Sequence, residues 1–246
     1  MATKLVGPIQ FQGKLGTIVG RATRKGNISV GMAPTKYTNP NTIAQRKARA
    51  KFLASQAFAN GVPIECFAGL VPAARSGKMS VRNMAFKITN KNTDFTFQET
   101  SETIEATLNA QYFKFSKGQG AMYSSIELDA DTPHKLIVTY NYTQDVDVNT
   151  TLIHAIVYVP DVKLFLHKTI ILPQVGTSYE FDFDIPEQCN GLKAHAYFYE
   201  QHFDNTDAMT YFYDLGSATY GAATWANMAG NSTFSDTVYA GSTTLN

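Results

Sequence analysis

The sequence predicts a mainly β protein of the α+β class. An N-terminal extended arm, a hairpin and helices come first, followed by an antiparallel immunoglobulin-like β-sandwich. Three observations predict this order. Aromatic residues make up 12% of the 246 residues, a level typical of strands. Apolar residues recur at helical spacing before about residue 92, and from about residue 93 they alternate with polar ones. Polar turns separate at least seven strand candidates, as in a sandwich.

The arm and its basic hairpin occupy residues 1–40, which are rich in Gly and Pro. Strand-like runs at 16–21 and 27–32 flank the turn candidate Lys25-Gly26, where glycine accepts the positive φ that a tight turn needs. A two-stranded hairpin with so small an apolar face is not stable alone. We therefore expect this segment to be stabilised by contacts outside the hairpin.

The helical segment spans residues 41–92. It begins with a capping box, T-x-x-Q, at residues 42–45, and the run to residue 60 consists largely of good helix formers. Pro and Gly interrupt residues 62–74, which predicts a short or distorted helix there. Apolar spacing predicts a further helix over residues 80–90.

The β-sandwich is predicted over residues 93–216. Its clearest strand alternates Tyr179, Phe181 and Phe183 with acidic residues, the pattern of a half-buried strand. The Cys…Trp…Cys spacing of true immunoglobulin domains is absent from the sequence. The other strand candidates are 95–115, 136–142, 152–159, 164–172, 193–199 and 209–214.

Residues 217–246 form a tail in which 19 of 30 residues are Ala, Gly, Ser or Thr. This composition is typical of a flexible linker. Aromatic side chains often anchor protein interfaces. We therefore expect Trp225, Phe234 and Tyr239 to bind a neighbouring copy of the chain.

Charge divides the chain more sharply than its net value of +1 suggests. Residues 1–90 contain 14 Lys or Arg and one acid, whereas residues 91–246 contain 7 Lys or Arg and 19 acids. The two parts should meet different partners, or copies should associate head to tail. The candidate partner-binding cations are Arg21, Arg24 and Lys25 on the hairpin and Arg46, Lys47, Arg49 and Lys51 on the helix. They suit an acidic protein surface better than nucleic acid, because no DNA-binding motif accompanies them.

The sequence contains no motif for nucleotide binding, nucleophilic catalysis or metal ligation. Residues 13–20 are glycine-spaced but lack the context of a phosphate loop, and Cys66 has no evident base. His154 and His195 are predicted to lie on sheet faces, and Asp182 and Asp184 on a solvated face. We therefore expect no enzymatic activity, no metal and no cofactor. The sequence contains no run of 18 apolar residues, so it predicts no membrane-spanning helix.

Five motifs resemble a poorly characterised protein family of Bacteroidota and their phages. They are GPI at residues 7–9, GKLGTIVG at 13–20, an N-P-x-T-x-A-Q segment running from 39 to 52, YVPDVK at 158–163 and YFYDLG at 211–216. The likeness covers about residues 5–216. Some relatives resemble virion components of crAss-like tailed phages, so the resemblance implies a non-enzymatic building block.

Within that setting we expect an auxiliary, or decoration, protein of the capsid, made in the bacterial cytoplasm and located in the virion. Its partners would be the major capsid protein and neighbouring copies, with residues 1–60 anchored on an acidic shell. One alternative is a surface or glycan-binding module of a head fibre or tail, using Tyr197, Tyr199 and Phe203. The other is a protein of the capsid interior that contacts DNA through the helix cations.

Overall fold

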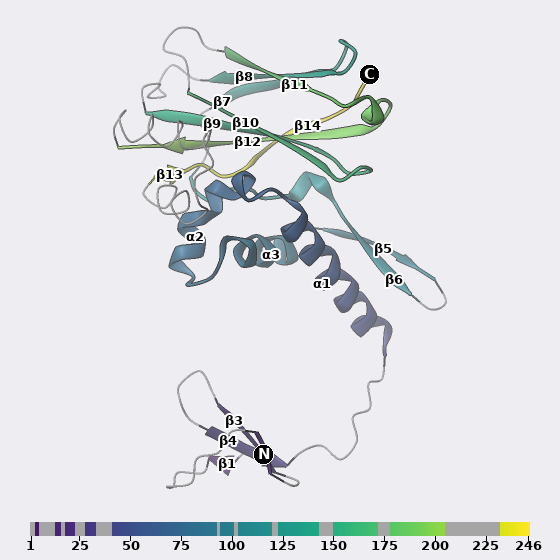
Figure 1. Ribbon diagram of the computed structural model, residues 1–246, viewed down its shortest axis with the longest axis vertical. Helices are drawn as coiled ribbons and strands as arrows, with labels where there is room; N and C mark the ends of the chain where they lie inside the picture. The colour runs from purple at the N-terminus through teal and green to yellow at the C-terminus, as the bar shows by residue number, and fades with distance from the viewer. Residues whose placement is uncertain are drawn as a thin grey trace. The chain divides into compact units, whose positions relative to one another are not determined.

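The computed structural model divides the chain into two compact units, residues 1–42 and 43–246 (Figure 1). It describes residues 3–4, 13–15, 18–22, 28–32, 41–92, 94–100, 103–119, 123–142, 150–171, 178–204 and 232–246. The second unit combines helices with antiparallel sheets, so the protein is of the α+β class and mainly β, as predicted.

The first unit is a four-stranded antiparallel sheet in which the predicted hairpin is central. The hairpin strands pair with Gly20 opposite Val30. One short strand joins each outer edge of this pair. The strand order is β1 (Thr3–Lys4), β4 (Ile28–Met32), β3 (Ile18–Ala22) and β2 (Gly13–Leu15).

The second unit opens with the helices that the sequence predicted, including the break between them. Pro72 occupies the first turn of α2, where a missing N–H costs nothing. The Arg82 guanidinium donates to the carbonyl oxygens of Ala59 at 2.7 Å and Asn60 at 3.1 Å, so it caps the end of α1. The elements are α1 (Ile43–Gly61), the 3-10 helix η1 (Ile64–Leu70), α2 (Val71–Ser76) and α3 (Val81–Asn92).

A separate hairpin follows the helices, where the sequence analysis placed sandwich strands. Its strands β5 (Phe95–Glu99) and β6 (Ile104–Leu108) pair only with each other among the described residues, and β6 packs beside α1. Alternation shows that a strand has one covered face, but it does not show what covers that face. Assigning residues 95–108 to the sandwich was therefore wrong.

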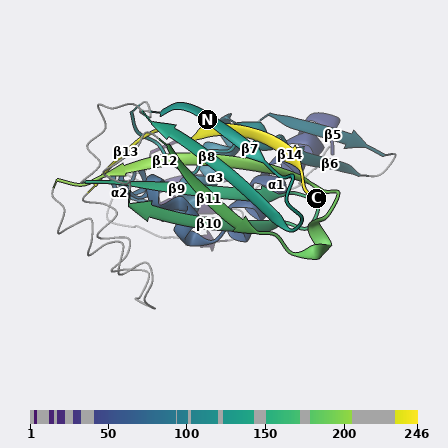
Figure 2. The ribbon, with the colours of Figure 1, turned by 90° about the horizontal axis from the view of Figure 1, so that it is seen from above.

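Two antiparallel sheets make up the rest of the unit (Figures 1 and 2). The smaller sheet has the order β11 (Ser178–Asp184), β8 (Lys135–Tyr142) and β7 (Tyr123–Asp129). The larger sheet has the order β10 (Leu164–Ile171), β9 (Thr151–Val159) and β12 (Lys193–His202), and both β13 (Thr233–Phe234) and β14 (Val238–Thr244) pair with β12. Short 3-10 turns lie at Ala110–Tyr112 and Glu187–Cys189.

The larger sheet is the middle of three layers, between the helices and the smaller sheet. Leu152 and Ile156 of β9 pack toward the helices, whereas Ile153, Ala155 and Val157 pack toward the smaller sheet. A strand covered on both faces reads as a continuous apolar run. This explains the sequence TLIHAIVYV, in which eight of nine residues are buried.

The C-terminal segment corrects the predicted tail. Residues 232–246 belong to the larger sheet, because β14 pairs with β12 from Lys193 to Phe198 and Leu245 is buried. Small Ala, Gly, Ser and Thr side chains resemble a linker by composition, yet a strand requires only backbone pairing and one covered face. The predicted strand 209–214 lies outside the described residues.

Candidate functional site

The four cations predicted on the first helix lie on α1, but two of them contact the chain's own hairpin. The Lys47 Nζ atom lies 2.5 Å from Glu99 Oε1 and 5.5 Å from the centre of the Phe97 ring. The Lys51 Nζ atom lies 4.7 Å from the centre of the Phe95 ring. Exposed contacts of these kinds contribute up to about 1 kcal/mol each. Lys47 and Lys51 therefore fasten β5–β6 to α1.

The remaining predicted cations divide between the two units. On α1, Arg46 is half-buried and Arg49 is exposed. Arg21 belongs to β3, where only its backbone is described. Arg24 and Lys25 lie outside the described residues. The structure thus places the helix cations and leaves the hairpin cations as predictions.

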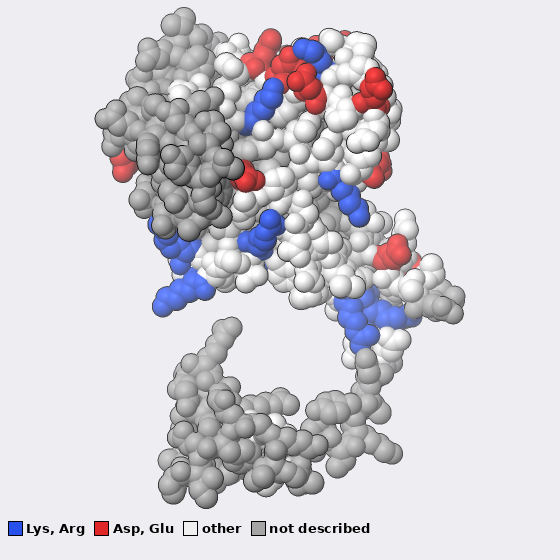
Figure 3. Space-filling view, in the orientation of Figure 1, with Lys and Arg blue, Asp and Glu red and all other residues white. Residues whose placement is uncertain are grey.

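Further exposed cations lie on α2 and α3 and in the turn between them, and they were not among the predicted partner-binding residues. They widen the basic surface of the helical layer, where Figure 3 shows Lys and Arg side chains. Glu65 is the single acid in residues 43–92. The positive excess before residue 90 was the available signal for this surface. The exposed members are Arg75, Lys78, Lys87 and Lys91.

Two of the three tail aromatics contact their own chain, and the burial of Phe234 contradicts its predicted role as an anchor on a neighbour. Phe234 is 5% exposed and belongs to the core between the helices and the larger sheet. The Tyr239 ring centre lies 5.5 Å from that of Tyr197, and its hydroxyl lies 3.0 Å from His195 Nδ1. Trp225 lies outside the described residues.

Hydroxyl side chains hold the C-terminal segment to the loop before β7. Thr237 Oγ1 accepts hydrogen bonds from the backbone N–H groups of Phe115 at 2.8 Å and Ser116 at 2.7 Å. Ser116 Oγ donates to the Ser235 carbonyl oxygen, and Ser235 Oγ accepts from Glu200 N–H at 2.7 Å. Each of these bonds satisfies a buried group that would otherwise lose its hydration without compensation.

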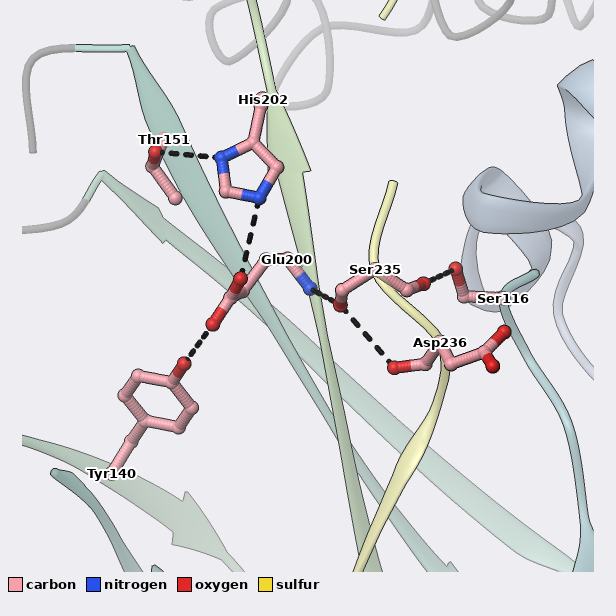
Figure 4. A network of polar contacts seen from close by, with 7 residues as sticks. All are labelled: Ser116, Tyr140, Thr151, Glu200, His202, Ser235 and Asp236. Atoms are coloured by element: carbon pink, nitrogen blue, oxygen red, sulfur yellow. Dashed lines mark hydrogen bonds and ion pairs between the residues drawn. The ribbon is translucent and has the colours of Figure 1, made fainter. Parts of the chain in front are cut away.

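A buried carboxylate joins the two sheets at the end of β12 (Figure 4). Tyr140 of the smaller sheet donates its phenolic hydrogen to Glu200 Oε1. His202 Nε2 lies 3.2 Å from Glu200 Oε2, and His202 Nδ1 lies 3.0 Å from Thr151 Oγ1. Burial, followed by the nearby Glu200 charge, raises the pKa of Tyr140, which keeps the phenol protonated as a donor. The arrangement acts as a polar crosslink between layers.

A second buried polar cluster lies on β9 and β10. His154 Nε2 lies 2.8 Å from Gln201 Oε1, and His154 Nδ1 lies 3.1 Å from His167 Nε2 and 3.0 Å from Thr169 Oγ1. The His154 ring stacks on Tyr199, with ring centres 4.4 Å apart. Burial lowers the pKa of His154 to about 3 and that of His167 to about 4. These imidazoles are therefore neutral at pH 7.

The aromatics proposed for a glycan site are core residues. Tyr197 and Tyr199 are fully buried, and Phe203 is 9% exposed. The Tyr197 and Tyr199 hydroxyls donate to the carbonyl oxygens of Ala110 and Cys66. Their strand is covered on both faces, so alternation could not reveal which residues face solvent. A sugar-binding role for these three rings was wrong.

The Cys66 thiol is also buried, and burial raises its pKa to about 12, with the Glu65 charge as a smaller cause. It is therefore a core side chain and not an activated nucleophile. Within the described residues, no group of three or more His, Cys, Asp or Glu side chains is arranged to hold a metal ion.

No protein-family model matches the chain, and no curated protein is similar to it at a significant level. Among the described helices, none alone is long and apolar enough to cross a membrane. Helix α1 and residues 64–76 are long and apolar enough when they are taken together, but a bend of 107° separates them.

Proposed function

We propose that this chain is a non-enzymatic structural protein of a tailed-phage virion, most specifically an auxiliary or decoration protein of the capsid. One observation carries the proposal. The chain folds as two compact units, and residues 1–42 contain six Lys or Arg and no acid. A small unit of one charge sign, joined to a larger folded unit, suits an anchor that binds an acidic surface. The resemblance to phage-associated sequences supplies the setting.

The larger unit would then present an immunoglobulin-like sandwich. Its topology supports this assignment, because β7, β8 and β11 take the positions of strands A, B and E. In the facing sheet, β10, β9, β12 and β14 take the positions of C′, C, F and G. Such sandwiches expose loops at both ends and need no catalytic residues to act as spacers or binding modules.

Quantitative mass spectrometry of gradient-purified phage particles tests the placement. A copy number equal to that of the major capsid protein, or a simple fraction of it, is expected for a decoration protein. A handful of copies per particle would indicate a fibre, tail or vertex component, and absence from the particle would refute the proposal.

Deletion of residues 1–42 tests the anchor. The chain from residue 43 is compact by itself, so it should fold and yet fail to join the particle. The matched control is a full-length chain with Lys47 and Lys51 replaced by methionine, which keeps the anchor and loses only the cations that contact β5–β6. Incorporation that survives the deletion would refute the anchor.

The four predicted cations of α1 would also suit DNA inside the capsid. That alternative predicts binding to duplex DNA whose affinity falls steeply with salt, because each phosphate contact releases counterions. Loss of binding on substituting Arg46, Lys47, Arg49 and Lys51 by alanine would support it. Affinity that does not change with salt would count against it.

A further inference from the structure

The outer face of the smaller sheet is acidic. Glu127 and Glu180 flank Thr139 across the three strands, and Asp129 and Asp182 flank Ile137 in the next row. All four carboxylates are exposed, as is Asp184 beside them. Strands lie about 4.8 Å apart, so each row places two carboxylates roughly 10 Å apart on a flat surface.

One cation shares this face among the outward positions of the three described strands. Lys135 Nζ lies 2.7 Å from Asp182 Oδ2, which raises the pKa of Lys135. Lys168 of β10 reaches the edge of this face, where its Nζ atom donates to the Asp182 carbonyl oxygen. Five carboxylates against two ammonium groups leave a net charge of −3 on a surface that no described element covers. A surface of this kind attracts a basic partner.

The matching surface belongs to the same chain and lies on its opposite side. The helical layer exposes Arg49, Arg75, Lys78, Lys87 and Lys91. Within the second unit, the larger sheet separates this layer from the acidic face. Figure 3 shows acidic side chains gathered at the sandwich end, with a few Lys or Arg side chains among them, and basic side chains at the helical end. One copy cannot bring its two faces together, whereas two copies can.

We infer that the acidic outer face of β7, β8 and β11 docks on the basic helical layer of a second copy. The inference rests on the proposed function, because it names one of the partners of a surface-acting protein. The contact joins two different surfaces, so it is heterologous and repeats from copy to copy into a ring or an open chain. Exposed charge pairs are individually weak and screened by salt, so association should be weak and salt-sensitive.

Sedimentation-velocity ultracentrifugation of the nuclease-treated full-length protein tests this inference. In about 0.01 M salt, where the Debye length is about 30 Å, the weight-average mass should rise with protein concentration. In about 1 M salt it should return to the monomer mass. A monomer at both salt concentrations would overturn the proposal.

Charge reversal tests the two faces separately. E127K/E180K alters the acidic face and K78E/K87E alters the basic face, and each variant alone should remain monomeric in low salt. Their mixture should form dimers and nothing larger, because each variant keeps one working face. The chain carrying all four substitutions should remain monomeric, because neither face then keeps a large excess of charge. Circular dichroism confirms that each variant is folded.

Undiminished association of either two-site variant would overturn the assignment of that face. Failure of the mixture to form dimers would also overturn it. These outcomes are separate from the particle test above. A monomeric protein that is present in virions would refute the head-to-tail contact alone, and an associating protein absent from virions would refute the virion role alone.

Discussion

Acidification should weaken the fold through His154. This side chain is 2% exposed, and its pKa is lowered to about 3 because burial removes the water that would solvate its charge, with His167 as a smaller cause. In the unfolded chain a histidine titrates near 6.5. The unfolded state therefore binds more protons than the native state between about pH 6.5 and pH 3. The free energy of unfolding falls as the pH is lowered through that window.

The size of the effect follows from the two pKa values. Each unit of pKa difference corresponds to 1.36 kcal/mol, so lowering the pH from 7 to 5 should cost about 2 kcal/mol through His154 alone. His167, with its pKa lowered to about 4 by burial, adds to the loss. A typical domain has about 5–15 kcal/mol of stability in total, so the change is measurable.

Urea denaturation of wild type and His154→Gln at pH 7, 6 and 5 isolates this contribution, because the difference between them cancels shared carboxylate effects. The variant should be less stable at pH 7 and lose about 2 kcal/mol less than wild type on going to pH 5. Thr169→Val is the control. It removes the hydroxyl 3.0 Å from His154 Nδ1 but keeps the imidazole, so it should retain the wild-type slope. Equal slopes for wild type and His154→Gln would refute the reasoning.

Three further substitutions test the packing. Tyr140→Phe leaves Glu200 Oε1 without its buried donor and should cost about 1–3 kcal/mol in urea denaturation, and a neutral result would show that the crosslink contributes nothing. Phe234→Ala should cost about 3–5 kcal/mol in the same assay, because the ring is part of the core, and a loss below 1 kcal/mol would mean that the segment is not docked. Gly191→Ala should lower the melting temperature by an amount equivalent to about 1 kcal/mol, because φ is 75° at this position and a side chain is strained there. Gly61→Ala is the control and should not lower it, because the added methyl group meets no neighbour. Equal effects of the two substitutions would contradict the backbone argument.

Local patterns predicted the elements whose surroundings are simple. Tyr179, Phe181 and Phe183 alternate with exposed acids, because β11 has one face on the core and one in water, and the structure shows this. The break between α1 and α3 was visible from Pro63 and Pro72. These residues act through their own backbone, so the sequence alone carries the information.

Features that depend on distant contacts could not be predicted in this way. Small side chains in residues 238–244 gave no sign that β12 would pair with them, since pairing is a property of two strands. Glu200 lies just beyond the predicted strand 193–199, and only the structure supplies Tyr140 as its partner. The same holds for His154 and Gln201, which are 47 residues apart.

The late position of β14 has a consequence for synthesis. Until residues 238–244 have left the ribosome, β12 lacks its partner from Lys193 to Phe198, and the nascent chain presents an unpaired strand edge. Such edges template aggregation between incomplete chains, and the hazard lasts for as long as the closing segment is missing. A released chain truncated just before residue 238 should therefore be captured by chaperones more strongly than the full-length chain, in which β14 can pair with β12.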